Sequence, residues 1–201
     1  MSHYYSEEQE SELNLSQISD LLRGERLEFY VASGVFSKSK IDKGTKVLID
    51  NVILNPDWTI LDLGCGYGPV GISIAKSDAT IKVHMTDINK RAVMLAKKNI
   101  VLNKLDKKRF RITQGNSFSP VDQKVEFDSI LLNPPQTAGK KLCFDMVREA
   151  KEHLKKGGLL QLVARHNKGG ASFMKLMEEV YGNAKDICKE KGYRVYVSKK
   201  Q

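Results

Sequence analysis

Short apolar runs alternate with longer segments of helical periodicity from residue 58 to residue 181. Between residues 90 and 102, Ala92, Leu95, Ala96 and Asn99 recur at the spacing of one helix face. The pattern predicts strands at 58–63, 81–85, 110–113, 127–132 and 159–164, with helices opening at 70–75 and spanning 90–102, 141–154 and 171–181. Repeated strand–helix units of this kind imply a parallel, doubly wound sheet.

The C-terminal end departs from this alternation. Two further strands are predicted at 184–189 and 193–198, and only a short turn at Gly192 joins them. They must pair antiparallel, because a parallel crossover needs roughly a dozen or more residues. The predicted fold is therefore α/β: a doubly wound, mostly parallel seven-stranded sheet with a C-terminal antiparallel strand.

The N-terminal part predicts a small addition to that sheet. Apolar segments at 18–22 and 27–31 flank a turn at Gly24 and indicate a β-hairpin. A loop at 32–42 and a helix at 45–54 follow, and Pro56 marks the next boundary.

Composition limits the class of protein. The 201 residues are 41% hydrophobic, which is typical of one globular domain, and no apolar run approaches the roughly 18–20 residues of a membrane span. The N-terminus is polar and acidic, unlike a signal peptide. Cys65, Cys143 and Cys188 are widely separated, so we expect no zinc site and a reducing, cytoplasmic location.

The net charge of +9 is unevenly spread. Residues 1–28 contain seven acidic and two basic residues, a net charge of −5, so the remainder carries +14. A basic body favours a polyanionic partner such as RNA. The alternative is a solvated lysine-rich surface, which is common in soluble proteins.

The turn after the first strand of the alternation is rich in glycine. Gly64, Gly66 and Gly68 let a ligand approach the backbone, and the loop meets a helix N-terminus. A dinucleotide site shares this spacing, but the Asp62 carboxylate would repel a pyrophosphate. It suits a ligand with an ammonium and a sulfonium, as in S-adenosylmethionine. We predict that this cofactor contacts Asp62, Gly64, Cys65, Gly66 and Gly68.

Polar residues also follow the next two strands. Asp87 ends the second strand, where a carboxylate can accept hydrogen bonds from two ribose hydroxyls, and Ile88 follows it. Asn116 and Ser117 follow the third strand, where they could contact the adenine. The structural alternatives are a helix N-cap at Asp87 and an ordinary turn at Asn116.

Asn133, Pro134 and Pro135 end the fourth strand. The prolines fix the backbone and remove two N–H donors, leaving the Pro134 carbonyl and the Asn133 side-chain oxygen as acceptors. An exocyclic NH₂ group offers two hydrogens to this pair, and both bonds stabilise positive charge that develops on nitrogen. We predict that Asn133, Pro134 and Pro135 are catalytic and that Asn133 also borders the cofactor. The alternative for the three residues alone is a structural turn.

Acid-x-Gly-x-Gly-x-Gly with Asn-Pro-Pro resembles the Rossmann-like class I methyltransferases that use S-adenosylmethionine. More narrowly, residues 30–200 are similar to the methyltransferase small domain family, which includes 16S ribosomal RNA guanine-N2 methyltransferases. Gly34-Val35-Phe36-Ser37, Asp42-x-Gly44-Thr45 and Ala138-Gly139-Lys140 also carry the resemblance. It implies methylation of guanine N2 in ribosomal RNA. It also implies that residues 1–44 are an extension whose loop covers the pocket, and 45–201 the methyltransferase domain.

One position departs from the family pattern. The residue after the two prolines is usually an aromatic ring that stacks on the target base, but here it is Gln136. Phe36 or Tyr30 could supply a ring instead, although Phe36 could equally be a plain core residue. We expect Phe36, Gln136, Lys140 and Arg165 to bind the substrate.

Three other functions remain open at this point. Related enzymes methylate glutamine N5 in proteins, and others methylate adenine N6 in nucleic acids. A domain of this kind can also be a binding module without activity. Intact Asp62, Asp87 and Asn133 weigh against the last of these.

Overall fold

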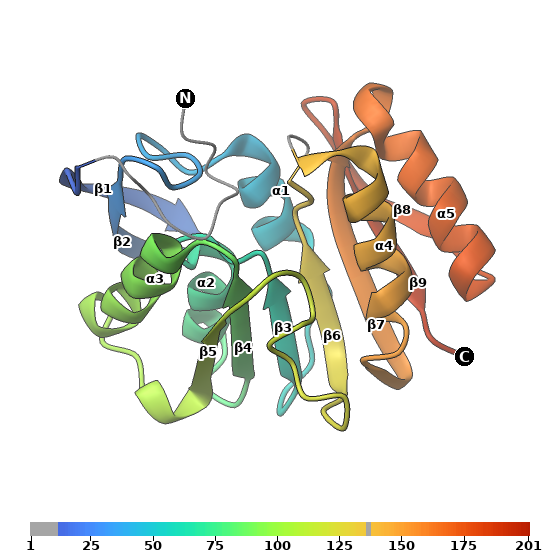
Figure 1. Ribbon diagram of the computed structural model, residues 1–201, viewed down its shortest axis with the longest axis horizontal. Helices are drawn as coiled ribbons and strands as arrows, with labels where there is room; N and C mark the ends of the chain where they lie inside the picture. Colours follow the sequence, from blue (N-terminus) through green and yellow to red (C-terminus); the bar gives the residue numbers. More distant parts are fainter. Residues whose placement is uncertain (1–11, 136–137) are drawn as a thin grey trace.

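The computed structural model describes residues 12–135 and 138–201. Their main feature is a seven-stranded sheet in the order β5-β4-β3-β6-β7-β9-β8 (Figure 1). The strands are β3 (Thr59–Leu63), β4 (Lys82–Asp87), β5 (Phe110–Gln114), β6 (Phe127–Leu132), β7 (Leu154–Arg165), β8 (Lys185–Glu190) and β9 (Tyr193–Lys199). Strand β9 runs antiparallel to both of its neighbours, while the pairings among β3 to β7 are parallel. The predicted fold class is confirmed.

Helices cover both faces of the sheet. Helices α1 (Lys43–Asn51), α2 (Pro69–Ser77) and α3 (Lys90–Leu102) share one apolar core. Helices α4 (Lys140–Ala150) and α5 (Ala171–Tyr181) share the other. Alternate residues of the central strands enter the two cores, with Ile60 on the first side and Leu61 on the second. A strand buried on both faces explains why the sequence shows continuous apolar runs.

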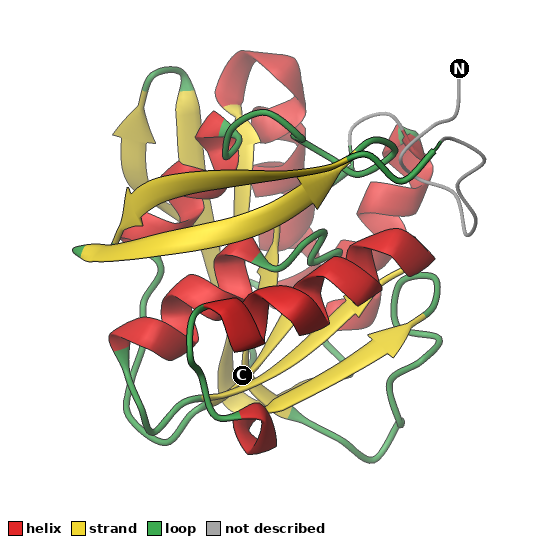
Figure 2. Cartoon of the chain, turned by 90° about the vertical axis from the view of Figure 1, so that its left-hand side faces the viewer, coloured by secondary structure: helices red, strands yellow, loops and turns green. Residues whose placement is uncertain are grey.

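The predicted N-terminal hairpin is present as β1 (Leu15–Leu22) and β2 (Glu25–Ala32). It lies across α2 and α3 (Figure 2). Two asparagines, Asn99 of α3 and Asn103 at the C-cap of that helix, bind the backbone of β2. The Asn99 amide exchanges two hydrogen bonds with the backbone of Tyr30, and the Asn103 amide does the same with Glu28.

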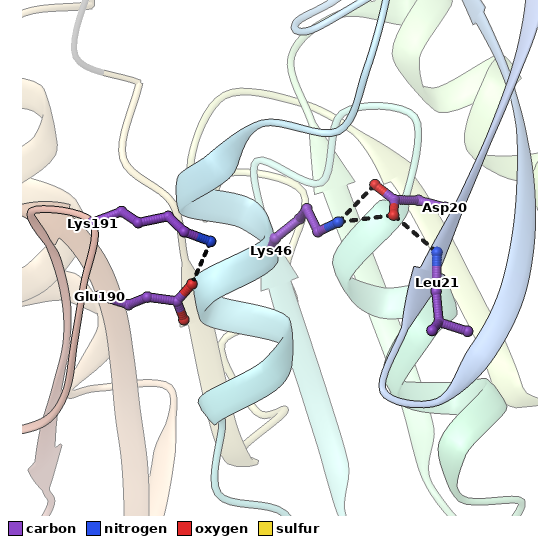
Figure 3. Close-up of polar contacts among 5 residues, drawn as sticks. All are labelled: Asp20, Leu21, Lys46, Glu190 and Lys191. Atoms are coloured by element: carbon purple, nitrogen blue, oxygen red, sulfur yellow. Dashed lines mark hydrogen bonds and ion pairs between the residues drawn. The ribbon is translucent and has the colours of Figure 1, made fainter.

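Helix α1 connects the hairpin to the sheet. Its Lys46 ammonium lies 2.8 Å from the Asp20 carboxylate of β1 (Figure 3). The Glu190–Lys191 ion pair, at the turn between β8 and β9, lies beside the same helix in that view. The described part of the 1–44 segment therefore contacts the domain through packed side chains and an ion pair, while the boundary between residues 44 and 45 stays a prediction.

Two predicted helices have wrong limits. The helix expected at 45–54 begins at Lys43, because the Asp42 side chain accepts the Thr45 N–H and caps it, and it ends at Asn51. The helix expected at 141–154 ends at Ala150, and Leu154 already pairs with Phe127 of β6. Strand β7 is accordingly longer than predicted and has an irregularity in its register with β6 between Phe127 and Ser129.

Candidate active site

A cavity of about 310 Å³ opens at the carboxyl ends of the parallel strands. Its walls come from the glycine loop after β3, the residues after β4, β5 and β6, and the segment between β2 and α1. The order of the strands reverses between β3 and β6. Doubly wound sheets bind ligands at such a reversal, so the cavity occupies the expected place.

The glycine loop is tied to the end of β4. The N–H groups of Gly64 and Cys65 both donate to the Thr86 carbonyl at 2.9 Å. Gly64, Gly66 and Gly68 all have positive φ, which other residues adopt only with strain. The loop backbone is thus already held in the shape that a ligand would meet.

Asp62 lies beneath this loop and is only 4% exposed. One carboxylate oxygen accepts the Gly71 N–H at 2.9 Å. Burial raises the pKa of Asp62 to about 7; the Gly71 hydrogen bond opposes this shift and the nearby Asp87 adds to it. Because burial makes ionisation of this carboxyl group unfavourable, the site favours a cationic ligand, which would stabilise the ionised form.

Asp87 is better supplied with donors. Its two oxygens accept the N–H groups of Asn89 at 2.8 Å and Gly66 at 2.7 Å. Burial nevertheless raises its pKa, against the effect of these two bonds. The carboxylate is therefore fixed in orientation at the mouth of β4 and keeps lone pairs for hydroxyl donors.

Three hydroxyl groups test whether the cavity fits the predicted cofactor. The Tyr67 hydroxyl, Thr86 Oγ1 and Ser117 Oγ are buried, belong to lining residues, and have no hydrogen-bond partner within the described part of the chain. A buried polar group without a partner costs about 1–3 kcal/mol, so such groups call for a polar ligand. S-adenosylmethionine, with its hydroxyls, amines and carboxylate, fits this lining.

Asn133 borders the cavity at the end of β6, with Pro134 and Pro135 beside it. Its amide nitrogen donates to Thr45 Oγ1 at 3.0 Å and lies 3.5 Å from Asp42 Oδ2. Both partners belong to the beginning of α1. Since the nitrogen points to α1, the amide oxygen is directed away from that helix.

The structure brings most of the predicted site residues to this one cavity. The predicted site residues that line it are Asp62, Gly64, Cys65, Gly66, Asp87, Ile88, Ser117, Asn133, Pro134, Pro135 and Phe36. Burial raises the pKa of the Cys65 thiol well above its usual value, with smaller contributions from Asp87 and Asp62, so it is a neutral lining group.

Other predicted residues lie outside the lining. Gly68 caps α2, and a Cβ there would meet Ile72 at 2.9 Å, so its smallness serves packing. Asn116 is not among the lining residues, although its neighbours Gly115 and Ser117 are. Lys140 lies over the Phe144 ring, and Arg165 lies 5.0 Å from the centre of the Tyr193 ring. Gln136 lies outside the described residues.

The sequence did not single out several residues of the cavity as site residues. Thr45 and Asp42 belong to the Asp42-x-Gly44-Thr45 segment, which carries part of the family resemblance, but the sequence assigned them no role. Tyr193 gave no signal, because it reaches the cavity only through the antiparallel placement of β9 beside β7. The Tyr67 phenol was not predicted as a site group, because the motif that contains it is defined by its glycines.

The comparison with known protein families decides which group of enzymes this site belongs to. The family model described as "Methyltransferase small domain" matches residues 26–197. The chain belongs to the methyltransferase small domain family. It is an S-adenosylmethionine-dependent methyltransferase of class I.

Relatives within this family differ in how much of their length is shared. The chain is 39% identical over 200 residues to the Bacillus subtilis protein described as "Uncharacterized protein YbxB", covering 98% of each. It is 35% identical over 171 residues to "Ribosomal RNA small subunit methyltransferase C" of Mannheimia succiniciproducens, covering 83% of this chain and 49% of that protein. The chain thus spans about half the length of that ribosomal RNA methyltransferase.

A solved structure supports the same architecture. The T. thermophilus 16S rRNA guanine-N2 methyltransferase RsmC, in complex with AdoMet and guanosine, superposes with a TM-score of 0.83. The match covers 95% of this chain and 52% of the other at 24% identity, and at that identity it shows the fold alone. Within the described residues, no helix is long and apolar enough to cross a membrane and no cluster of possible metal ligands is found.

Proposed function

We propose that this enzyme transfers a methyl group to the exocyclic N2 amine of guanine in ribosomal RNA. The observation that carries the proposal is the orientation of Asn133. Its amide nitrogen is bound on the α1 side, so its oxygen and the Pro134 carbonyl remain as acceptors for the two hydrogens of an amine.

The chemistry requires little more than this pair. S-adenosylmethionine, when bound, would supply an electrophilic methyl group, and transfer of that group to the amine nitrogen would leave a neutral thioether. The Asn133 and Pro134 oxygens hold the amine and stabilise the positive charge that develops on its nitrogen. The nitrogen then loses a proton to water. Among the described residues that line the cavity there is no His, Lys or Glu, which agrees with a reaction that needs no strong base before transfer.

Aromatic rings at the cavity favour a flat target. Tyr193 and Phe36 both line it, and Phe36 is 38% exposed. Tyr193 lies against the first turn of α1, next to the residues that contact Asn133. It can replace the stacking ring that is absent from the position after the two prolines, a contact worth roughly 1–3 kcal/mol per base. Arg165, behind Tyr193, would then stabilise the ring and the RNA backbone.

The relatives that are named as ribosomal RNA methyltransferases favour ribosomal RNA as the partner, and the three widely separated cysteines favour the cytoplasm as the location. Methylation of glutamine N5 in a protein or of adenine N6 in a nucleic acid uses the same two acceptors and is the alternative. A base inside a duplex must leave its stack to reach such a cavity, so we expect an unpaired guanine or an incompletely assembled ribosomal subunit as substrate.

The experiment is to incubate the protein with methyl-labelled cofactor and total RNA, isolated ribosomal subunits or a soluble protein extract, and then to identify the modified nucleoside or residue. Labelled N2-methylguanosine is the expected product. Label in N6-methyladenosine or only in protein contradicts the proposal. Asn133→Ala should abolish transfer while cofactor binding persists, and exposed Asn55→Ala is the matched control.

A further inference from the structure

The first turn of α1 makes an unusual contact with the catalytic motif. The Asn133 nitrogen, 88 residues away in sequence from Thr45, donates to its Oγ1 at 3.0 Å and approaches Asp42 Oδ2 to 3.5 Å. Thr45 is only 5% exposed. A carboxylate oxygen can only accept, so the amide must present its nitrogen, and not its oxygen, to Asp42.

The same Asp42 oxygen also begins the helix. It accepts the Thr45 N–H at 3.1 Å, and the Asp42 backbone is extended, as usual for an N-cap residue. One oxygen therefore links the start of α1 to the orientation of Asn133. Folding of α1 places Thr45 Oγ1 and Asp42 Oδ2 together on the side of the amide nitrogen.

We propose that Asp42 and Thr45 are positioning residues that hold the Asn133 amide with its oxygen toward the target amine. This inference rests on the proposed function for the identity of the amine, but the orientation itself does not depend on it. Without these two partners the amide could rotate about its last bond and present a donor to the amine, which would repel it.

The arrangement also explains why position 133 carries an amide and not an acid. The substitution Asn133→Asp would place a carboxylate oxygen where the nitrogen now lies, 3.5 Å from the Asp42 oxygen. Two carboxylates this close cannot both be ionised without a large cost. The choice of amide or acid at position 133 is thus coupled to the residue at position 42.

The first test compares Thr45→Val with Thr45→Ser. Valine keeps the shape and removes the acceptor, whereas serine keeps it. We expect Thr45→Val to lower kcat about tenfold, the effect of losing one hydrogen bond that orients the amide which holds the reacting amine, with cofactor affinity unchanged. Thr45→Ser should stay within about twofold of the unmodified protein, because it retains the hydroxyl. An unchanged kcat in Thr45→Val would overturn the proposal.

The second test exploits the coupling between positions 42 and 133. Asn133→Asp should lower kcat on the order of a hundredfold, because the two carboxylates repel each other. Adding Asp42→Asn should recover about tenfold of that loss, although Asp42→Asn alone should lower kcat slightly. Asn remains a good N-cap, so α1 is preserved. Asp50→Asn, on the exposed face of the same helix, is the matched control and should give no recovery.

A readout without turnover separates this inference from the proposed function. In an NMR spectrum of the side-chain amides, the Asn133 NH₂ signals should exchange slowly with solvent and should shift and exchange faster in Thr45→Val. If the labelled product is not N2-methylguanosine but these signals behave as expected, only the substrate assignment fails. If Asp42→Asn gives no recovery or the signals do not change, the positioning role fails, whatever the product is.

Discussion

Replacing Asp62 with Asn in the cofactor-free protein should separate stability from binding. Asp62 is buried beneath the glycine loop, and its carboxylate accepts the Gly71 N–H. Asparagine has the same shape and can accept the same bond, but it carries no charge. The substitution therefore removes the cost of ionising a buried acid while it leaves the packing in place.

The size of the effect follows from the pKa of Asp62, which burial raises from 3.8 to about 7. The folded chain then binds more protons than the unfolded chain between these two values, so the contribution of Asp62 to stability falls as the pH rises from 4 to 7. The full cost above pH 7 is about 4 kcal/mol, of which about 3 kcal/mol develops between pH 5 and pH 8.5.

The assay is urea unfolding of both proteins, without cofactor, at pH 5 and at pH 8.5. The free energy of unfolding of Asp62→Asn minus that of the unmodified protein should increase by about 3 kcal/mol between the two pH values. Asp50→Asn, an exposed acid, should show no such increase. An Asp62→Asn difference that is equal at both pH values would refute the reasoning. The more stable variant should nevertheless bind the cofactor more weakly, because it would lack the negative charge that we predict to attract the cationic groups of S-adenosylmethionine.

Three further changes test how the scaffold holds the site. Arg109→Met should lower the free energy of unfolding by about 2–4 kcal/mol, because the Arg109 guanidinium donates to three backbone carbonyls around the end of α2. The exposed control is Lys108→Met. Equal urea midpoints for Arg109→Met and the unmodified protein would contradict the prediction. Gly44→Ala should raise the KM for the proposed RNA substrate several-fold at nearly unchanged stability. Its Cβ would lie 2.8 Å from the Tyr193 ring, while alanine favours the helix by about 1 kcal/mol. An unchanged KM would exclude the ring from substrate binding. Asn99→Ala should cost about 3 kcal/mol in urea unfolding and also weaken cofactor binding measured by calorimetry, since three backbone groups lose their partner.

The sheet could be predicted from sequence because its signal is local. The strand at 127–132 and the helices at 90–102 and 171–181 have the predicted limits. The early start of α1 and the early end of α4 have side-chain or non-local causes. An N-cap hydrogen bond starts α1 early, and pairing with Phe127 converts Leu154 from helix to strand. The periodicity of apolar residues reveals neither the N-cap hydrogen bond nor the strand pairing.

The site divides in the same way. Residues at the carboxyl ends of parallel strands, such as Asp87 at the end of β4 and Asn133 directly after β6, could be placed together because these ends share one edge of the sheet. Tyr193 could not, since its position depends on β9 lying between β7 and β8. The contact between Asn133 and Thr45 also escaped prediction, because it joins two strand-and-helix units that are distant in sequence.

The segment before the predicted boundary at residues 44 and 45 contributes directly to the cavity. It supplies Phe36 and Asp42 to the lining. It is also connected to the glycine loop through Asn99, whose amide binds the Tyr30 backbone of β2 on one side and the Tyr67 carbonyl on the other. Asn99 is fully buried, so moving the hairpin would leave part of this amide without a partner, at a cost of about 1–3 kcal/mol. The ordering of the hairpin and the ordering of the glycine loop are therefore energetically linked, and a ligand that stabilises the loop should stabilise the hairpin as well.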